Sequence, residues 1–129
     1  MTLFCCVASQ VDGALDVTPV NTAVLAGQSA LLRCHTTVSF PANAINWFRR
    51  VNGGASESIA ASCALNPAFA SVYNLTLATA GQCDLVVSSV DTSLTGVYIC
   101  LEVANPPASA SAYLTIIGEC YSTCYSMCC

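Results

Sequence analysis

Gly96-Val97-Tyr98-Ile99-Cys100 decides the fold when it is taken together with two residues upstream. Cys34 stands about sixty-six residues before Cys100, and Trp47 follows Cys34 by about thirteen residues. The residues leading to Cys34 alternate, with Leu32 and Cys34 on one side of the chain, and this period of two is typical of a half-buried strand. No sustained helical period appears anywhere in the chain. The sequence therefore predicts an all-β fold.

The arrangement of Cys34, Trp47 and Cys100 resembles the immunoglobulin superfamily, and the long interval between the cysteines resembles its V-set branch. The resemblance implies an all-β, immunoglobulin-like two-sheet antiparallel sandwich with a V-type Greek key. It also implies a disulfide bridge between Cys34 and Cys100, packed against Trp47, and a tyrosine corner at Tyr98. The expected core contains Leu32, Trp47, Leu85, Val87 and Tyr98.

Turn residues and β-rich runs divide the chain into the strands that such a sandwich needs. We expect extended segments at residues 15–25, 29–34, 45–50, 71–77, 84–90, 97–104 and 111–117. His35 to Asn46 has the composition of a loop, because it contains a proline and two asparagines. Asn52-Gly53-Gly54 is a strong hairpin signal at the place where V-set domains insert extra strands.

The length of 129 residues is sufficient for one hydrophobic core and too short for two. We expect three parts: residues 1–14 as a clipped signal or N-terminal extension, residues 15–117 as the immunoglobulin V-set domain, and residues 118–129 as a Cys-rich tail. No run of 18 or more apolar residues is present, so we expect no membrane span in this chain.

The ten cysteines suggest an oxidising compartment, because a reducing cytosol would leave them as reactive thiols. We therefore expect a secreted protein or the extracellular part of a cell-surface protein. Asn74-Leu75-Thr76 is an acceptor for N-linked glycosylation, which fits that location and requires Asn74 to lie on the surface.

Cys63 and Cys83 are the only other cysteines inside the expected domain, which makes them the natural second pair; two buried free thiols are the alternative. V-set domains usually carry an Asp four residues before the corner tyrosine, paired with an Arg or Lys near the fourth strand. Here Leu94 occupies the Asp position, and no Arg or Lys follows Arg50. A bridge between Cys63 and Cys83 would then hold the edge of the domain that this ion pair holds in other V-set domains.

Charge and residue usage exclude several functions. The formal net charge is −4, with three arginines and no lysine, so we expect no nucleic-acid partner. The single histidine, His35, is expected to be a solvated loop residue, and the carboxylates are scattered without paired or metal-binding spacing. We therefore expect no enzymatic activity, no cofactor and no metal.

The resemblance implies an extracellular recognition domain of an immune-type receptor or adhesion protein, with a protein or glycan partner. If Trp47 and Cys100 face the core, alternation turns their neighbours outward on the same sheet. The expected interface consists of Phe48, Arg50, Ile99, Leu101 and Tyr113. V-set domains commonly associate through this sheet, so a homodimer, or a heterodimer with a related domain, is expected there.

A second hypothesis comes from the cysteines near the chain ends. These residues could join copies of the chain into covalent multimers, with the sandwich acting as a spacer; they are Cys5, Cys6, Cys120, Cys124, Cys128 and Cys129. Electrophoresis with and without reductant distinguishes the two hypotheses, because a ladder of oligomers supports the structural protein and a monomer supports the recognition domain.

Overall fold

The computed structural model describes residues 15–37, 45–51, 54–79, 81–103 and 107–118. The expected N-terminal extension and the terminal cysteines lie outside these residues. The strands are β1 Leu15–Val17, β2 Thr22–Leu25, β3 Ala30–Leu32, β4 His35–Thr36, β5 Ile45–Arg50, β6 Ser56–Ala61, β7 Ala64–Leu65, β8 Tyr73–Thr76, β9 Asp84–Val87, β10 Gly96–Glu102 and β11 Ala108–Ile117. Short 3-10 helices occur at η2 Pro67–Phe69 and η3 Thr92–Leu94.

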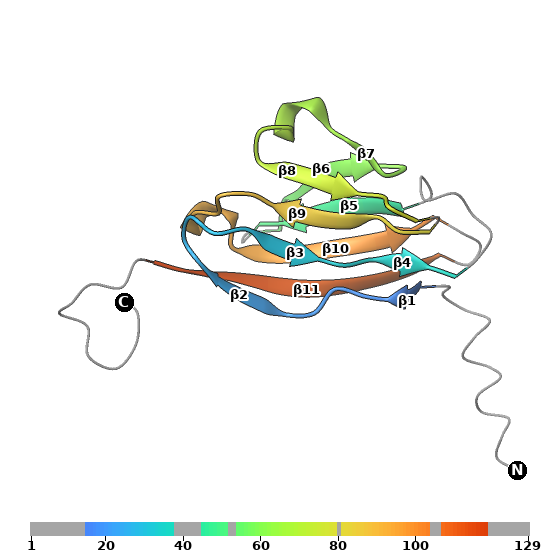
Figure 1. The fold of residues 1–129 in the computed structure, drawn as a ribbon, viewed down its shortest axis with the longest axis horizontal. Helices are drawn as coiled ribbons and strands as arrows, with labels where there is room; N and C mark the ends of the chain where they lie inside the picture. Colours follow the sequence, from blue (N-terminus) through green and yellow to red (C-terminus); the bar gives the residue numbers. More distant parts are fainter. Residues whose placement is uncertain (1–14, 38–44, 52–53, 80, 104–106, 119–129) are drawn as a thin grey trace, which may run out of the picture.

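The strands form three sheets, whose orders are β2-β11-β10-β5-β6-β7, β3-β9-β8 and β1-β4. All neighbouring strands are antiparallel except β2 and β11, which run parallel. Figure 1 shows the strands of all three sheets running along the long axis of the molecule. The prediction of an all-β chain is confirmed, and the arrangement is consistent with a sandwich.

The core lies between the six-stranded and the three-stranded sheet. Its largest side chains come from both sheets and are almost completely buried; they include Leu32, Trp47, Leu85, Val87 and Tyr98. Two disulfides run through this core. Cys34 is joined to Cys100 with a Cα–Cα distance of 6.5 Å, and Cys63 is joined to Cys83 with a distance of 6.1 Å.

Trp47 connects the two bridges. Its side chain is fully buried beside Cys34 and Cys100, and its indole Nε1 donates a hydrogen bond of 2.8 Å to the Cys83 carbonyl oxygen. A buried indole N–H needs such a partner, because an unpaired donor in the core is costly. The sheet that carries Trp47 is therefore fixed to the segment that carries the second bridge.

The first expected strand, residues 15–25, is divided between two sheets. Its first part, β1, pairs with β4, and its second part, β2, pairs with β11. Pro19 lies between the two parts and is buried. Proline has no N–H to donate to a ladder, so a crossing from one sheet to the other occurs at a position that cannot continue the strand.

Candidate functional site

The outward side of the six-stranded sheet presents a continuous surface over its three central strands. We call it the β5–β10–β11 face and define it by Phe48, Arg50, Val97, Ile99, Leu101, Ser109, Ser111 and Tyr113. These residues share one side because successive side chains along a strand point to opposite faces. Their neighbours Trp47, Tyr98, Cys100, Ala112 and Leu114 are buried.

The strand register brings the apolar residues of the β5–β10–β11 face together. Ile99 is directly opposite Phe48 on β5 and Ser111 on β11. Val97 is directly opposite both Arg50 and Tyr113, one step along the same face. Directly opposite residues on one face are close enough to touch. The predicted interface residues therefore form one patch.

Solvent exposure increases from the centre of this patch to its margin. Phe48, Ile99 and Leu101 are half-buried, while the Tyr113 side chain is 42% exposed. Arg50 is exposed, whereas the adjacent Arg49 is buried, as strand alternation predicts. The patch has an apolar centre and a polar margin, which is the usual anatomy of a protein–protein interface.

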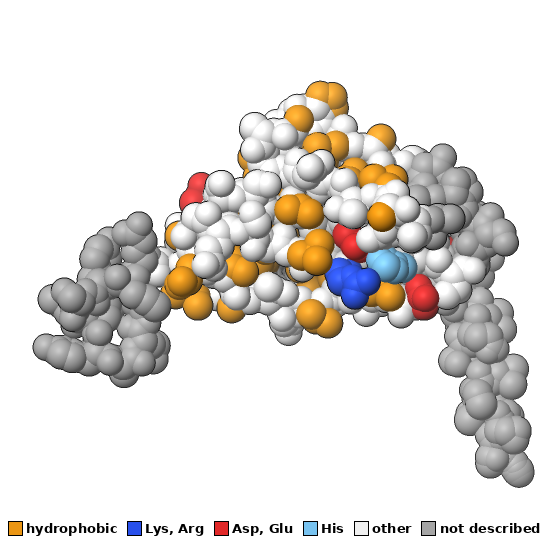
Figure 2. Space-filling view, in the orientation of Figure 1, with side chains coloured by type: hydrophobic (Ala, Val, Ile, Leu, Met, Phe, Trp, Pro, Cys, Tyr) orange, Lys and Arg blue, Asp and Glu red, His pale blue; other side chains and the backbone are white. Residues whose placement is uncertain are grey.

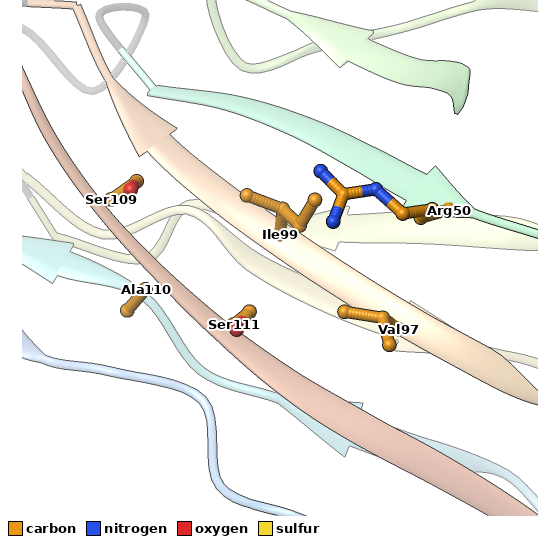
Figure 3. Close-up of a pocket in the computed structure, with 6 residues that line it drawn as sticks. All are labelled: Arg50, Val97, Ile99, Ser109, Ala110 and Ser111. Atoms are coloured by element: carbon orange, nitrogen blue, oxygen red, sulfur yellow. The ribbon is translucent and has the colours of Figure 1, made fainter. Parts of the chain in front are cut away.

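Small residues on β11 leave a hollow beside Ile99 (Figure 3). Its volume is about 230 Å³, and its lining consists of Arg50, Val97, Ile99, Ser109, Ala110 and Ser111. Pockets for small molecules usually enclose about 300 to 1,000 Å³ and bury most of the ligand. This open hollow is smaller than such pockets. Val97, Ser109 and Ser111 were missed in the sequence analysis, although Val97 lies two residues from Ile99 and the two serines lie four and two residues from Tyr113.

The charge of the β5–β10–β11 face comes from Arg50. Among the described residues the ion pairs involve Arg33 with Asp84, His35 with Asp84, and Arg49 with Glu57, and Arg50 takes part in none of them. None of the residues that define this face is acidic. The face is therefore positive, although the whole chain has a formal charge of −4.

Arg49 lies on the buried side of the same sheet and connects β5 to neighbouring elements. Its guanidinium donates to Glu57 Oε1 at 3.3 Å, to the Thr95 carbonyl oxygen at 3.3 Å and to the carbonyl oxygen of Ser93. These contacts join β5 to β6 and to the end of η3. The sequence analysis assigned the hold on the edge at Leu94 to the Cys63–Cys83 bridge. That bridge lies at the other end of β5, where Cys63 N donates to the Ile45 carbonyl oxygen, and Arg49 holds the end next to η3 instead.

Two buried tyrosines stand next to Arg49. The Tyr98 hydroxyl donates a hydrogen bond of 2.6 Å to the Leu94 carbonyl oxygen, and the hydroxyl oxygens of Tyr73 and Tyr98 are 3.3 Å apart. Burial raises the pKa of both phenols above the usual value of about 10. The folded protein therefore favours the protonated form of each phenol.

We expect the free energy of unfolding to fall as the pH rises above about 10. The pKa of each phenol is higher in the folded protein than in the unfolded chain. The stabilisation from Tyr73 and Tyr98 is therefore complete below the pKa of the unfolded chain and is lost as the pH rises toward the pKa of the folded protein. Tyr73→Phe should show a shallower decline than the wild type, because one of the two phenols no longer titrates. Urea unfolding at several pH values between about 8 and 11 measures both slopes; equal slopes would contradict this assignment.

A polar cluster surrounds Asp84, which is almost completely buried on the three-stranded sheet. The Asp84 carboxylate accepts hydrogen bonds from Cys34 N at 2.9 Å and from Gln82 Nε2 at 2.7 Å. His35 Nε2 lies 3.2 Å from Asp84 Oδ1, and Arg33 Nε lies 3.9 Å from Asp84 Oδ2. These groups hold the start of β9 against β3 and β4.

The prediction that His35 is a solvated loop residue is wrong. His35 begins β4, is half-buried, and pairs with Val17 of β1 and with Gln82 through an isolated bridge. The loop therefore begins later than expected. The local composition could not indicate this, because both pairing partners are distant in the sequence.

Within the parts of the chain that the structure describes, no group of three or more His, Cys, Asp or Glu side chains could hold a metal ion. The same residues include no helix that is long and apolar enough to cross a bilayer. Asn74 lies on β8 and is exposed. Comparison of the sequence with protein-family models gave no match, and comparison with curated proteins gave no match either.

Proposed function

We propose that this chain is an extracellular recognition domain of the immunoglobulin V type, which binds a protein partner through the β5–β10–β11 face. The strand order supports the V type. β6 and β7 extend the sheet beyond β5, as the extra strands of V-set domains do, and β2 adds to β11 at the other edge. The two disulfides and the exposed acceptor Asn74 support an extracellular location.

The single observation that carries the binding proposal is the apolar patch beside an open hollow. Phe48, Ile99 and Leu101 lie on adjacent strands and retain exposed surface. Monomeric proteins rarely expose large contiguous apolar patches, and such a patch generally marks an interaction site. The hollow beside Ile99 gives this patch a place to receive an anchor residue.

The charge of the face points to the chemistry of the partner. In this proposal a side chain of the partner enters the hollow, and a carboxylate of the partner pairs with Arg50, which lines the same hollow. A second copy supplies no such carboxylate, because the residues that define this face include no Asp or Glu. We therefore favour a heterodimer with a related, more acidic domain over a homodimer, and a protein partner over a glycan.

The test is a binding screen with soluble tetramers of the domain against a panel of cell-surface ectodomains. Phe48→Ser and Arg50→Glu should each weaken binding to any partner at least tenfold, because both remove central contacts. Leu77→Ser is the matched control, since Leu77 is 47% exposed and does not belong to the β5–β10–β11 face. Sedimentation of the same proteins measures self-association, which should be unaffected by Phe48→Ser.

Equal binding by wild type, Phe48→Ser and Arg50→Glu, with unchanged thermal unfolding, would contradict the proposal. The chain segments between β4 and β5 and between β10 and β11 would then be the better candidates. Binding that depends on a glycan of the partner, and is lost when that glycan is removed, would replace the protein partner by a glycan.

A further inference from the structure

The outward side of the three-stranded sheet carries a second apolar strip. Leu31 on β3 is directly opposite Val86 on β9, and Val86 is directly opposite Asn74 on β8. Leu31 is 50% exposed and Val86 is half-buried. The three residues form one row across the sheet, with two aliphatic side chains at one end and the glycosylation acceptor at the other.

The strip continues past Leu31 toward the N-terminal strand. A groove of about 290 Å³ is lined by Val17, Thr18, Val20, Leu31 and Arg33. Val20 is 70% exposed. Figure 2 shows hydrophobic side chains over β3 and β9, beside an arginine drawn in blue. Such a surface favours self-association unless something covers it.

The acceptor triplet has the geometry needed for a glycan on this side. Asn74 and Thr76 are both exposed, whereas the intervening Leu75 packs against the core, as alternation along β8 requires. The Asn74 Oδ1 atom accepts a hydrogen bond of 2.9 Å from Leu75 N. That bond does not use Nδ2, which is the atom that carries an N-linked glycan.

We propose that Asn74 carries an N-linked glycan whose core sugars lie across β9 and β3 and cover Val86 and Leu31. Leu31 is two strand spacings from Asn74, about 10 Å, and the first two N-acetylglucosamine rings span that distance. The less polar faces of these rings pack against the aliphatic side chains and remove apolar surface from water. The β5–β10–β11 face is then the open sheet face of the domain.

Attachment of the glycan needs a co-reactant from the secretory pathway. The donor class is an oligosaccharide linked to a lipid diphosphate. The bond between its first sugar carbon and the diphosphate oxygen breaks, a bond from that carbon to Asn74 Nδ2 forms, and Nδ2 loses a proton. This inference therefore rests on the extracellular location proposed above, and it is independent of partner binding.

The test uses the full chain secreted from mammalian cells and compares Thr76→Ser with Thr76→Ala. Serine keeps the acceptor triplet and alanine destroys it, while Asn74 and all cysteines remain unchanged. Peptide-N-glycosidase should shift the mass of the wild type and of Thr76→Ser only. Thr76→Ala should bind at least twice as much of a hydrophobic fluorescent dye as Thr76→Ser and should self-associate more in sedimentation.

A second substitution locates the uncovered surface. Adding Leu31→Ser to Thr76→Ala should return dye binding to the level of Thr76→Ser. Leu25→Ser is the matched control, because Leu25 is 38% exposed on β2 in the other sheet and should leave dye binding high.

Three results would each overturn the proposal: no mass shift in the wild type, equal dye binding by Thr76→Ser and Thr76→Ala, or equal recovery with Leu25→Ser and Leu31→Ser. A domain that carries the glycan but binds no partner through Phe48 would contradict the proposed function and leave this inference intact.

Discussion

Replacing Cys34 and Cys100 together with alanine is expected to lower the free energy of unfolding by about 4 kcal/mol. The bridge closes a loop with a sequence separation of 66, and the entropy that it removes from the unfolded chain grows with loop length. Both cysteines are completely buried, so the paired substitution avoids a free thiol in the core. Small domains have total stabilities of about 5 to 15 kcal/mol, so this loss is a large part of the whole.

Urea unfolding followed by the fluorescence of the single tryptophan measures this effect, since Trp47 packs between the sheets. The matched control replaces Cys63 and Cys83 with alanine. That bridge has a sequence separation of 20, so its removal should cost about 3 kcal/mol, less than the first. A larger loss from the second pair would contradict loop entropy as the main source of stabilisation.

The sequence predicted the features that depend on local patterns. The period of two in residues 45–50 and 97–102 indicated strands, and it placed Arg49 and Arg50 on opposite faces. The same alternation predicted which residues accompany Phe48 on the outward side. The cysteine pairs of the structure are those that were expected, because the family resemblance implied Cys34–Cys100 and left Cys63 and Cys83 as the other two cysteines of the expected domain.

Features that depend on distant contacts could not be predicted in this way. His35 belongs to a strand because β1 and Gln82 pair with it, and neither partner is local. The division of residues 15–25 between two sheets depends on where β4 and β11 lie. The hollow beside Ile99 requires the register of β10 against β11, which places the small Ser111 opposite Ile99. Local patterns establish which residues face outward, but only the register of the strands shows which of them meet.

Arg49 is the clearest case, because its role depends on a turn that is formed far along the chain. Its side chain is only 10% exposed, and it donates to carbonyl groups of Ser93 and Thr95 at the end of η3. η3 is itself fixed by Asp91, whose carboxylate accepts hydrogen bonds from Ser93 Oγ and from Ser93 N, the latter at 2.8 Å. These two contacts lower the pKa of Asp91. Arg49 therefore connects β5 with a turn that already has a defined shape.

Arg49→Met is expected to lower the free energy of unfolding by about 3 kcal/mol, because hydrogen bonds to a charged group contribute about 1.5 to 3 kcal/mol each and exposed carbonyls partly rehydrate. Arg49→Lys should cost about 2 kcal/mol, since a lysine ammonium cannot reach both carbonyls and Glu57 with the planar fork of a guanidinium. Chemical denaturation measures both variants against the wild type.

Glu57→Gln is the control that separates the carbonyl contacts from the ion pair. The Glu57 side chain is 36% exposed, so its pairing with Arg49 is screened by solvent and the substitution should cost less than about 1 kcal/mol. Methionine keeps the apolar stem but has no donors, and the remaining Glu57 carboxylate is exposed enough to be hydrated after the substitution. A neutral Arg49→Met would therefore show that Arg49 acts by packing alone, whereas a loss larger than that of Glu57→Gln assigns the stabilisation to the carbonyls of η3.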